Sequence, residues 1–329
     1  MRIHAIRLAL LSAAVLGATP AISQTSSPSW PTRPVTLIVP YGAGGSVDVV
    51  ARVVASKLGD RLGQTVVVEN AAGAGGVTGT QRAARAEPDG YTLLFSVESS
   101  MAIAKFVQPS SVKYDSLTDF QPISLIGDAP LVLAGKKDLP ASNMKELLAL
   151  LKESPGKYNF ASSGVGTSLH VAGEMINIEG QVKMVHVPYR VGAQMVTDLV
   201  GSQIDLAVLP LVMALPNYRT GNIKVFGITE PERSVLAPDL PSLGEQTALK
   251  NVNVTVWYGM FAPAKTDPAI VTRLYNEIAA LMKEPEMKTK LADVNLRVVG
   301  SSPAEFSAFL AKEIEKYDAI VKAANIKAE

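Results

Sequence analysis

Residues 40–48 read PYGAGGSVD and connect an apolar run typical of a strand, 35–39, to an amphipathic helix predicted over 46–62. Within this loop Gly44 and Gly45 permit positive φ angles and let a ligand approach the main chain. A helix N-terminus presents free N–H groups and the positive end of the helix dipole. The junction is therefore suited to bind an anion.

Polar residues surround the two glycines. Tyr41 opens the loop and is a candidate ligand contact, while Ser46 is the predicted N-cap. Asp48 lies in the first helical turn, where it can accept backbone N–H groups; its expected role is mainly structural, with ligand contact as the alternative. The loop is not a Walker A motif, because no Gly-Lys-Ser/Thr follows, and it lacks the third glycine of G-x-G-x-x-G. A tight turn without a ligand is the simpler interpretation of such a loop taken alone.

Two more junctions of the same kind follow. Residues 162–168, SSGVGTS, come after a predicted strand and open a predicted helix, and residues 189–193, YRVGA, do the same. The first supplies as candidate ligand contacts Ser162, Ser163, Gly164 and Thr167. In the second, Tyr189 is a candidate, and Arg190 could pair bidentately with a carboxylate or lie on a solvated rim. Three such helix ends directed at one place would form a receptor for a small carboxylate.

Strand and helix patterns alternate along the chain, which predicts parallel α/β units with right-handed crossovers. The first unit has predicted strands at 35–39, 65–69 and 91–95 and helices at 46–62 and 77–86. The second has strands at 158–161, 182–187, 206–209 and 223–228 and helices at 143–152, 167–177, 192–200 and 211–220, the first of them capped by Ser142. An extended run, 252–261, and two amphipathic helices, 267–283 and 303–324, complete the chain.

The late extended run and the terminal helices suggest that the chain returns to the first unit. We therefore expect two α/β domains, one formed by residues 31–127 and 256–329 and the other by residues 128–255. Two crossing segments, near 123–133 and 252–261, would form a hinge. Ligands in open α/β sheets bind at the carboxyl ends of strands. A cleft between the domains would then close on its ligand by hinge motion.

Residues 1–23 have the organisation of a secretory signal peptide. Arg2 and Arg7 form a basic start, residues 8–17 form an apolar stretch too short to span a bilayer, and small residues stand at 21 and 23. We expect cleavage before Gln24, with cleavage two residues earlier as the alternative. The mature protein is therefore expected in the periplasm.

The composition limits the classes of partner and cofactor. The chain has 31 Lys and Arg against 30 Asp and Glu, and removal of a leader with two arginines leaves a formal charge near −1. This balance argues against nucleic acid or an anionic membrane as a partner. The absence of cysteine excludes disulfides, thiolate metal sites and a lipid anchor on cysteine. We expect no metal, no cofactor and a monomer.

The sequence contains no arrangement typical of a catalyst, so no catalytic residue is predicted. The pattern G-x-S-x-G is absent, and His170 and His186, the histidines outside the leader, lack the spacing of a catalytic triad. Packed histidines are the favoured interpretation of both. A secreted serine hydrolase whose triad assembles in space is the alternative from another functional class.

Acidic residues also lie where a ligand is expected. Glu98 and Ser99 follow the third predicted strand, at its carboxyl end. A carboxylate there would repel an anionic ligand unless it faced an amine, a hydroxyl group or Arg190. Asp205, just before the strand at 206–209, is a further candidate, although acceptance of turn N–H groups is its simpler role.

At these loops the chain strongly resembles the extracytoplasmic receptors of tripartite tricarboxylate transporters, the Bug family. The matching stretches are PYGAGGSVD at 40–48, VVVEN at 66–70, GAGG at 73–76, PDGYTLL at 88–94, SSGVGT at 162–167 with His170, and VPYR at 187–190. The likeness covers essentially the whole chain after the leader. Departures are Ala71-Ala72 where Arg-Pro is usual, Val191 where glycine is common, and Glu98-Ser99 in a stretch that is usually rich in Thr and Gly.

This resemblance implies a periplasmic-binding-protein-like (type II) α/β fold, with two domains joined by two crossing strands and a ligand cleft between them. The implied function is capture of a small organic carboxylate and its delivery to the permease subunits of a membrane transporter. A receptor that reports the ligand to a membrane signalling kinase is the alternative within binding proteins. Carried over from the family, the ligand-binding positions are Tyr41, Gly44, Gly45, Ser163, Gly164, Thr167 and Tyr189. The Glu98 departure favours a hydroxylated, amino-bearing or aromatic acid over a simple dicarboxylate or tricarboxylate.

Overall fold

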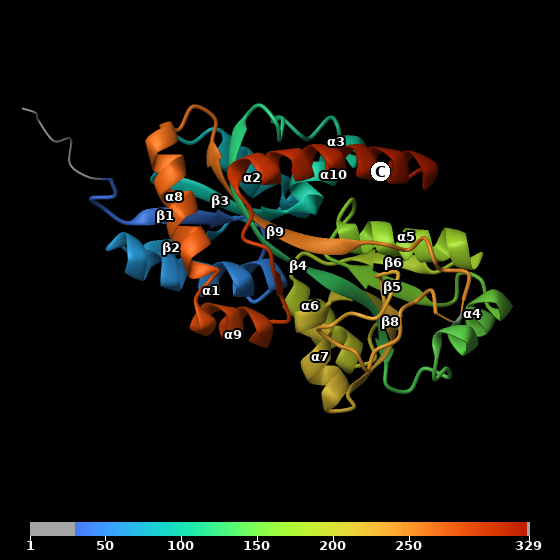
Figure 1. The fold of residues 1–329 in the computed structure, drawn as a ribbon. Coiled ribbons are helices and arrows are strands. Elements are labelled where there is room, and N and C mark those ends of the chain that lie inside the picture. The colour runs from blue at the N-terminus through green and yellow to red at the C-terminus, as the bar shows by residue number, and fades with distance from the viewer. Residues whose placement is uncertain (1–29, 246, 328–329) are drawn as a thin grey trace, which may run out of the picture. The chain divides into compact units, whose positions relative to one another are not determined.

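The computed structural model describes residues 30–245 and 247–327. The predicted signal peptide lies outside these residues. From Pro31 onward the chain forms one compact unit, and its strands join in a single sheet with the order β2-β1-β3-β9-β4-β7-β5-β6 (Figure 1). In the described part of the chain, no helix is both long and apolar enough to cross a membrane.

The first half of the sheet is parallel, as the alternating pattern predicts. β1 (Val35–Val39) lies between β2 (Val66–Asn70) and β3 (Thr92–Val97), and both pairings are parallel. The helices that connect these strands are α1 (Ser46–Leu62) and α2 (Val77–Ala84). Gly63 ends α1 in the left-handed conformation expected at this position. After β3 the chain forms a π-helical turn, Ser99–Ile103, and the short α3 (Ala104–Val107).

The second half repeats this arrangement. β5 (Asn159–Ser162) lies between β6 (Val185–Pro188) and β7 (Leu206–Pro210), again in parallel. Its helices are α4 (Met144–Glu153), α5 (Ser168–Gly180), α6 (Gly192–Val200) and α7 (Leu211–Arg219). The predicted cap Ser142 is wrong: Asn143 caps α4, because its side chain accepts the N–H of Glu146.

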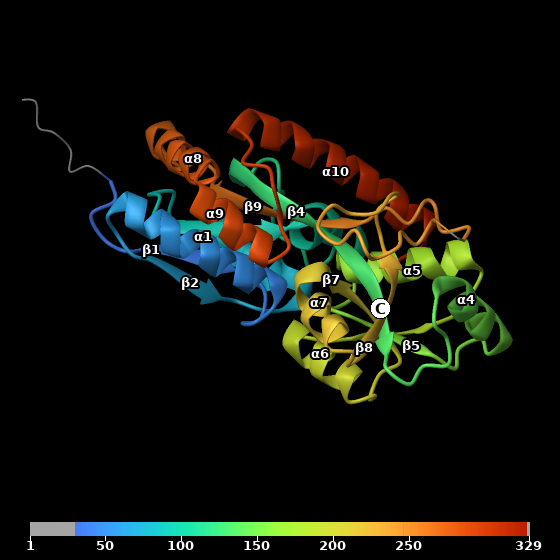
Figure 2. The ribbon, with the colours of Figure 1, turned by 60° about the horizontal axis from the view of Figure 1, so that its bottom comes forward.

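Two long strands connect the halves. β4 (Phe120–Lys136) pairs antiparallel with β9 (Thr255–Pro263) over its first part, and β9 in turn pairs with β3. From Leu131 onward β4 pairs instead with β7 and with β8 (Ile223–Ile228). Figure 2 shows β4 running from β9 toward β7 and β8. The two predicted crossing segments are therefore adjacent strands of one sheet.

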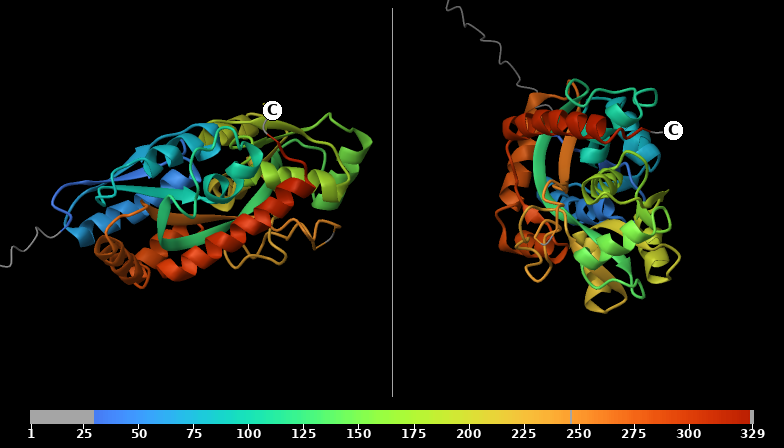
Figure 3. Two further views of the ribbon diagram at one scale, coloured as in Figure 1. Left: turned by 90° about the horizontal axis from the view of Figure 1, so that it is seen from above. Right: turned by 90° about the vertical axis from the view of Figure 1, so that its right-hand side faces the viewer.

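The C-terminal elements pack on the first half and on the linking strands, as their position in the sequence predicts. They are α8 (Pro268–Leu281), α9 (Pro285–Asp293), β10 (Arg297–Val298), which pairs with β4, and α10 (Pro303–Ala323). Figure 3 shows α10 lying along β4 and β9. The ring of Phe306 on α10 packs against Trp257 and Phe261 of β9, with ring centroids 5.7 and 4.9 Å away. The elements α3 and β10 are absent from the predicted pattern because each covers too few residues to show a period. α9 is also absent from it, because this largely polar helix buries only Met287 and Leu291 and so shows a weak apolar pattern.

Close packing of α2 against β1 supports a test of the fold. A Cβ atom at Gly79 would lie 2.6 Å from the carbonyl oxygen of Ala71 and 2.7 Å from the Cα of Pro40. Because both are backbone atoms, Gly79→Ala should lower the free energy of unfolding by about 1–3 kcal/mol in urea denaturation. The matched control is Gly201→Ala, whose Cβ would come no closer than 3.3 Å to Thr197, and we expect a change within about 0.5 kcal/mol there. Similar losses in both variants would contradict this packing.

Candidate functional site

The loop at 40–48 presents a helix N-terminus without a side-chain cap. α1 begins at Ser46, and its N-cap is Gly45, which offers no capping side chain. The prediction that Ser46 is the N-cap is therefore wrong, because its backbone already lies in the helix. Gly44 has a φ of 76°, a left-handed conformation that glycine adopts without strain. The first N–H groups of α1 thus remain available to a ligand.

Asp48 fixes the shape of this loop. Its carboxylate accepts the N–H of Gly44 at 2.9 Å, Nε of Arg52 at 3.0 Å and Nδ2 of Asn70 at 2.9 Å. Burial opposes ionisation of Asp48, but these hydrogen bonds outweigh it and hold the pKa of the carboxyl below its usual value. The geometry agrees with the structural role expected for Asp48.

The two loops of the second half end at the N-termini of α5 and α6. Thr167 caps α5: its Oγ1 accepts the N–H of His170 at 3.4 Å and donates to the carbonyl of Gly164 at 2.8 Å. α6 begins at Gly192, and its N-cap Val191 provides no capping hydrogen bond. Of the three predicted anion-binding junctions, two therefore lack a side-chain cap.

Glycines let the loops of the two halves approach closely. A Cβ atom added at Gly42 would lie 3.4 Å from the side chain of Val191, and one added at Gly192 would lie 3.9 Å from the Cα of Gly45. A Cβ at Gly75 would lie 3.3 Å from the carbonyl oxygen of Val165. The backbones of these loops therefore nearly touch across the boundary between the halves.

A cavity of about 60 Å³ lies where the loops meet. One water needs only about 10–15 Å³ on this measure, so the cavity has room for a small molecule. Its polar lining consists of Tyr41, Ser46, Glu98, Ser99, Ser163, Ser168 and Arg190. Apolar lining comes from Val47, Val97, Leu169, Met195, Met213 and Val256. Every parallel strand except β2 contributes through the residues at or after its carboxyl end, the position at which open α/β sheets bind ligands.

A larger groove adjoins the cavity and shares Tyr41, Ser163 and Arg190 with it. It has a volume of about 510 Å³ and is lined also by residues 72–76, Gln108 and Tyr189. Tyr189 donates its hydroxyl to Asp198 at 2.7 Å, and burial raises the pKa of this phenol to about 12. Arg190 is exposed to solvent.

Glu98 is a fully buried carboxyl group in the cavity wall, with no exposed surface. One of its oxygens accepts the N–H of Trp257 at 3.0 Å and the other accepts the hydroxyl of Ser99 at 3.2 Å. Burial raises the pKa of Glu98 to about 7. Within the described residues, no Lys, Arg or His forms an ion pair with it.

Ser168 connects Glu98 to the N-terminus of α5. The N–H of Ser168 donates to the hydroxyl oxygen of Ser99 at 3.1 Å. The hydroxyl of Ser99 in turn donates to a carboxylate oxygen of Glu98. The side-chain oxygen of Ser168 is buried, has no partner within 3.5 Å and lies near the carboxylate of Glu98, whose ionised form its hydroxyl favours. Since Ser168 also lines the cavity, a molecule that contacts Glu98 there would lie beside this hydroxyl.

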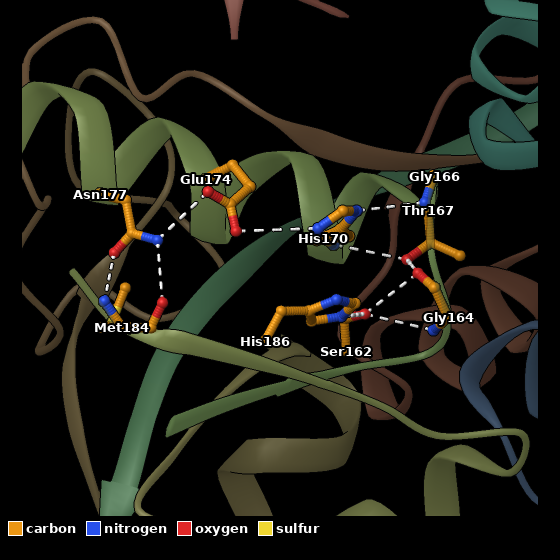
Figure 4. A network of polar contacts seen from close by, with 9 residues as sticks. All are labelled: Ser162, Gly164, Gly166, Thr167, His170, Glu174, Asn177, Met184 and His186. Atoms are coloured by element: carbon orange, nitrogen blue, oxygen red, sulfur yellow. Dashed lines mark hydrogen bonds and ion pairs between the residues drawn. The ribbon is translucent and has the colours of Figure 1, made fainter. Parts of the chain in front are cut away.

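Behind the second-half loop lies a closed network of polar side chains (Figure 4). Ser162 is fully buried, donates its hydroxyl to the carbonyl of Gly164 at 3.1 Å and lies 2.6 Å from Nε2 of His186. The imidazole rings of His186 and His170 stack with centroids 3.9 Å apart. His170 accepts the N–H of Gly166 on Nδ1, and its Nε2 lies 3.7 Å from Glu174.

This network holds the loop rather than activating Ser162. Ser162 is fully buried, so its hydroxyl is closed to a substrate whichever of Gly164 and His186 accepts its proton. Burial lowers the pKa of His170 to about 3 and that of His186 to about 4, so both rings are neutral at physiological pH. The geometry agrees with the packed histidines favoured by the sequence.

The structure brings half of the predicted site residues into the cavity wall. These are Tyr41, Gly45, Ser46, Glu98, Ser99, Ser163 and Arg190. Gly164 and Tyr189 line the adjoining groove, whereas Gly44, Asp48, Ser162 and Thr167 lie in the loops that carry these residues.

Asp205 is not brought to the site. It lies before the first residue of β7, whereas Pro210 at the far end of that strand lines the cavity. Its carboxylate pairs with Lys136 at 2.9 Å and accepts the N–H of Asn159 at 3.0 Å. These contacts match the simpler role given to it from the sequence.

Two methionines that line the cavity, Met195 and Met213, have no place in the sequence-based site. Ser168, whose position at the start of a predicted helix makes its hydroxyl a possible cap and donor, is not among the candidate ligand contacts although it also lines the cavity. Nothing in the sequence distinguishes the two methionines from core residues, because their apolar side chains fit the helical periodicity of any buried face. In the part of the chain that is described, no cluster of three or more His, Cys, Asp or Glu could hold a metal ion.

The buried Glu98 predicts a specific dependence of stability on pH. Its pKa rises from 4.5 to about 7 on folding, so the folded state binds the proton more tightly and loses stability as the pH rises through this interval. Glu98→Gln does not titrate and should gain about 1–3 kcal/mol relative to wild type over the same interval, measured by urea denaturation at several pH values. The exposed Glu232 supplies the control, because Glu232→Gln should show a constant difference. A constant difference for Glu98→Gln as well would contradict the shift.

Comparison with known proteins places these features in a family. A sequence model described as "Tripartite tricarboxylate transporter family receptor" matches residues 50–326. Protein BugT of Bordetella pertussis is 34% identical over 303 residues, which cover 92% of each chain. Periplasmic binding protein BugD, a solved structure, has a TM-score of 0.85 at 31% identity and covers 91% of this chain and 100% of its own. Rpa4515 of R. palustris, solved with adipate, has a TM-score of 0.87 at 28% identity, with 91% and 99% covered. These likenesses confirm the expected periplasmic-binding-protein-like fold.

Proposed function

The chain belongs to the tripartite tricarboxylate transporter receptor family, and on this basis we propose that it is a periplasmic receptor that captures a small organic carboxylate. The observation that carries the proposal is the cavity between the halves. The uncapped N-termini of α1 and α6 and the buried start of α5 converge there, together with Arg190. Free N–H groups and a guanidinium are the donors that a carboxylate requires.

Selectivity for an anion must come from these local groups. The expected charge of the mature chain is near zero, so long-range attraction of an anion is weak. Backbone N–H groups at a helix N-terminus act over the first turn only. A ligand would therefore be held by direct contacts from the loops of both halves, which the glycines allow to approach one another.

We propose that the halves are domains that close on the ligand. One domain would consist of residues 31–127 and 256–329 and the other of residues 128–255, with β4 and β9 as the crossing strands. The continuous pairing of β4 with both halves supports this division. Hinge closure around a ligand is the usual motion of such binding proteins.

The destination of the ligand follows from the family. Its description names receptors of tripartite transporters, and we propose that this chain is a monomer that delivers its ligand to the permease subunits of such a transporter. An export signal at residues 1–23 fits that location. Adipate is the ligand present in the structure of Rpa4515, which supports a small carboxylate as the class of ligand here.

Thermal unfolding with a panel of small organic acids tests the proposal. A ligand present at 100 times its Kd should stabilise the folded state by about 2.7 kcal/mol and raise the Tm. Gly45→Val should remove this shift, because Gly45 lines the cavity and faces Gly192 across it. Gly201→Val, on the exposed end of α6, should keep the shift. No shift with any acid, or an unchanged shift in Gly45→Val, would contradict the assignment.

The contact between Ser162 and His186 makes a serine hydrolase the second candidate. A nucleophilic serine would react with a fluorophosphonate probe. Because Ser162 is buried and donates its hydroxyl to Gly164, we expect no labelling of the folded protein. Stoichiometric labelling that Ser162→Ala abolishes would establish the hydrolase instead.

A further inference from the structure

The cavity wall contains a buried carboxyl group that lacks a cationic partner. Glu98 has no exposed surface, and the groups that favour its ionised form are neutral donors: the N–H of Trp257, the hydroxyls of Ser99 and Ser168, and its own N–H. The other titratable groups that influence it, or that it influences, are tyrosines and a second carboxylate: Tyr41, Tyr258, Tyr317 and Glu313. The described residues, 30–245 and 247–327, therefore supply no ion-pair partner to an ionised Glu98.

Glu313, a second buried carboxylate in the same region, does have a cationic partner. It is buried, accepts Nε1 of Trp257 at 3.1 Å and pairs with Nζ of Lys316 at 3.1 Å. Burial of a charge without such a partner is strongly unfavourable. A binding site can accept this cost when the ligand provides the missing charge, since the free energy is recovered on binding.

A second polar atom near Glu98 also lacks a partner. The hydroxyl oxygen of Ser168 is buried, lines the cavity and has no partner within 3.5 Å; its proton favours the ionised form of Glu98, and the oxygen keeps its capacity to accept. A protonated amine has three N–H donors and requires several acceptors. Glu98 and Ser168 together offer it a charged acceptor and a neutral one.

On the assumption that the proposed carboxylate receptor is correct, we propose that its ligand also carries a protonated amine, and that Glu98 is the counter-charge for this amine. The carboxylate of the ligand lies at the N-termini of α1 and α6 and at Arg190. The amine lies at Glu98 and Ser168. With about 60 Å³ of space, the ligand is a small amino acid or short amino-alkanoic acid.

Binding of acids that lack the amine, compared with binding of their amino analogues, tests this proposal. A simple carboxylate would place its charge in the same cavity as Glu98, and that carboxyl would have to take up a proton for both to be accommodated. Burial already raises the pKa of Glu98 to about 7, so such an acid would bind more weakly as the pH rises above this value. A zwitterion would keep its affinity there, because it needs Glu98 ionised.

Isothermal titration calorimetry of the mature protein above pH 7 separates these cases. The probes are matched sets: alanine with lactate and propionate, and 4-aminobutyrate with butyrate. We expect the amine-bearing member of the better-binding set to bind at least tenfold more tightly than its analogues. Glu98→Gln, which keeps the size of the side chain, should weaken the amino acid at least tenfold and leave the deaminated acid unchanged or tighter. Glu313→Gln is the buried control and should keep the wild-type preference.

The outcomes distinguish this inference from the function on which it rests. If propionate or butyrate binds as tightly as its amino analogue, or if Glu98→Gln keeps the preference for the amine, Glu98 is not the counter-charge and the receptor for simple carboxylates stands. If none of these probes binds but another acid raises the Tm, the amine-bearing ligand is wrong and the proposed receptor stands; if no acid binds at all, both proposals are wrong. Thermal unfolding of each variant establishes that a loss of binding is not a loss of fold.

Discussion

The pairing of β4 with β9 is the interaction on which the remainder of the structure depends. It extends from Phe120 opposite Pro263 to Pro130 opposite Thr255, and β4 then continues into the second half beside β7 and β8. Because one strand belongs to both halves, it brings the carboxyl ends of their parallel strands to a common cavity. α10 covers this joint through Phe306, whose ring fits against β9 where Gly259 has no side chain.

Close approach of the loops then depends on glycine. A Cβ atom at Gly75, whose φ is 63°, would lie 3.3 Å from the carbonyl oxygen of Val165 in the opposite half, whereas one at Gly42 or Gly192 would make ordinary contacts with the loop across the boundary. This proximity places helix N-termini from both halves around one small volume. A helix dipole acts over about one turn, and the convergence of several N-termini is what makes the cavity a strong candidate for an anion.

Two sets of buried polar groups lie next to the cavity, and they differ in how far their hydrogen bonds are satisfied. Ser162, Gly164 and Thr167 form hydrogen bonds with one another, and the neutral histidines behind them complete the support of the loop. Glu98 is a buried carboxyl group whose pKa is raised by desolvation, and Ser168 beside it has no partner within 3.5 Å. Saturated networks stabilise one conformation, whereas unsatisfied groups in a cavity wall are available to a ligand.

The sequence alone determined the alternation of strands and helices, the glycine loops and their family, because periodicity and turn chemistry are local properties. It also identified Glu98 as a carboxylate that would repel an anionic ligand. It placed the N-caps of α1 and α4 one residue away from their positions and kept Asp205 as a candidate, since neither cap geometry nor the end of a strand that faces a ligand can be read from spacing. Only the tertiary structure decided that Ser168, Met195 and Met213 join the site and that Glu98 is buried without an ion pair to any residue the structure describes. Burial, the absence of an ion pair and contact between loops more than a hundred residues apart are properties of the folded chain.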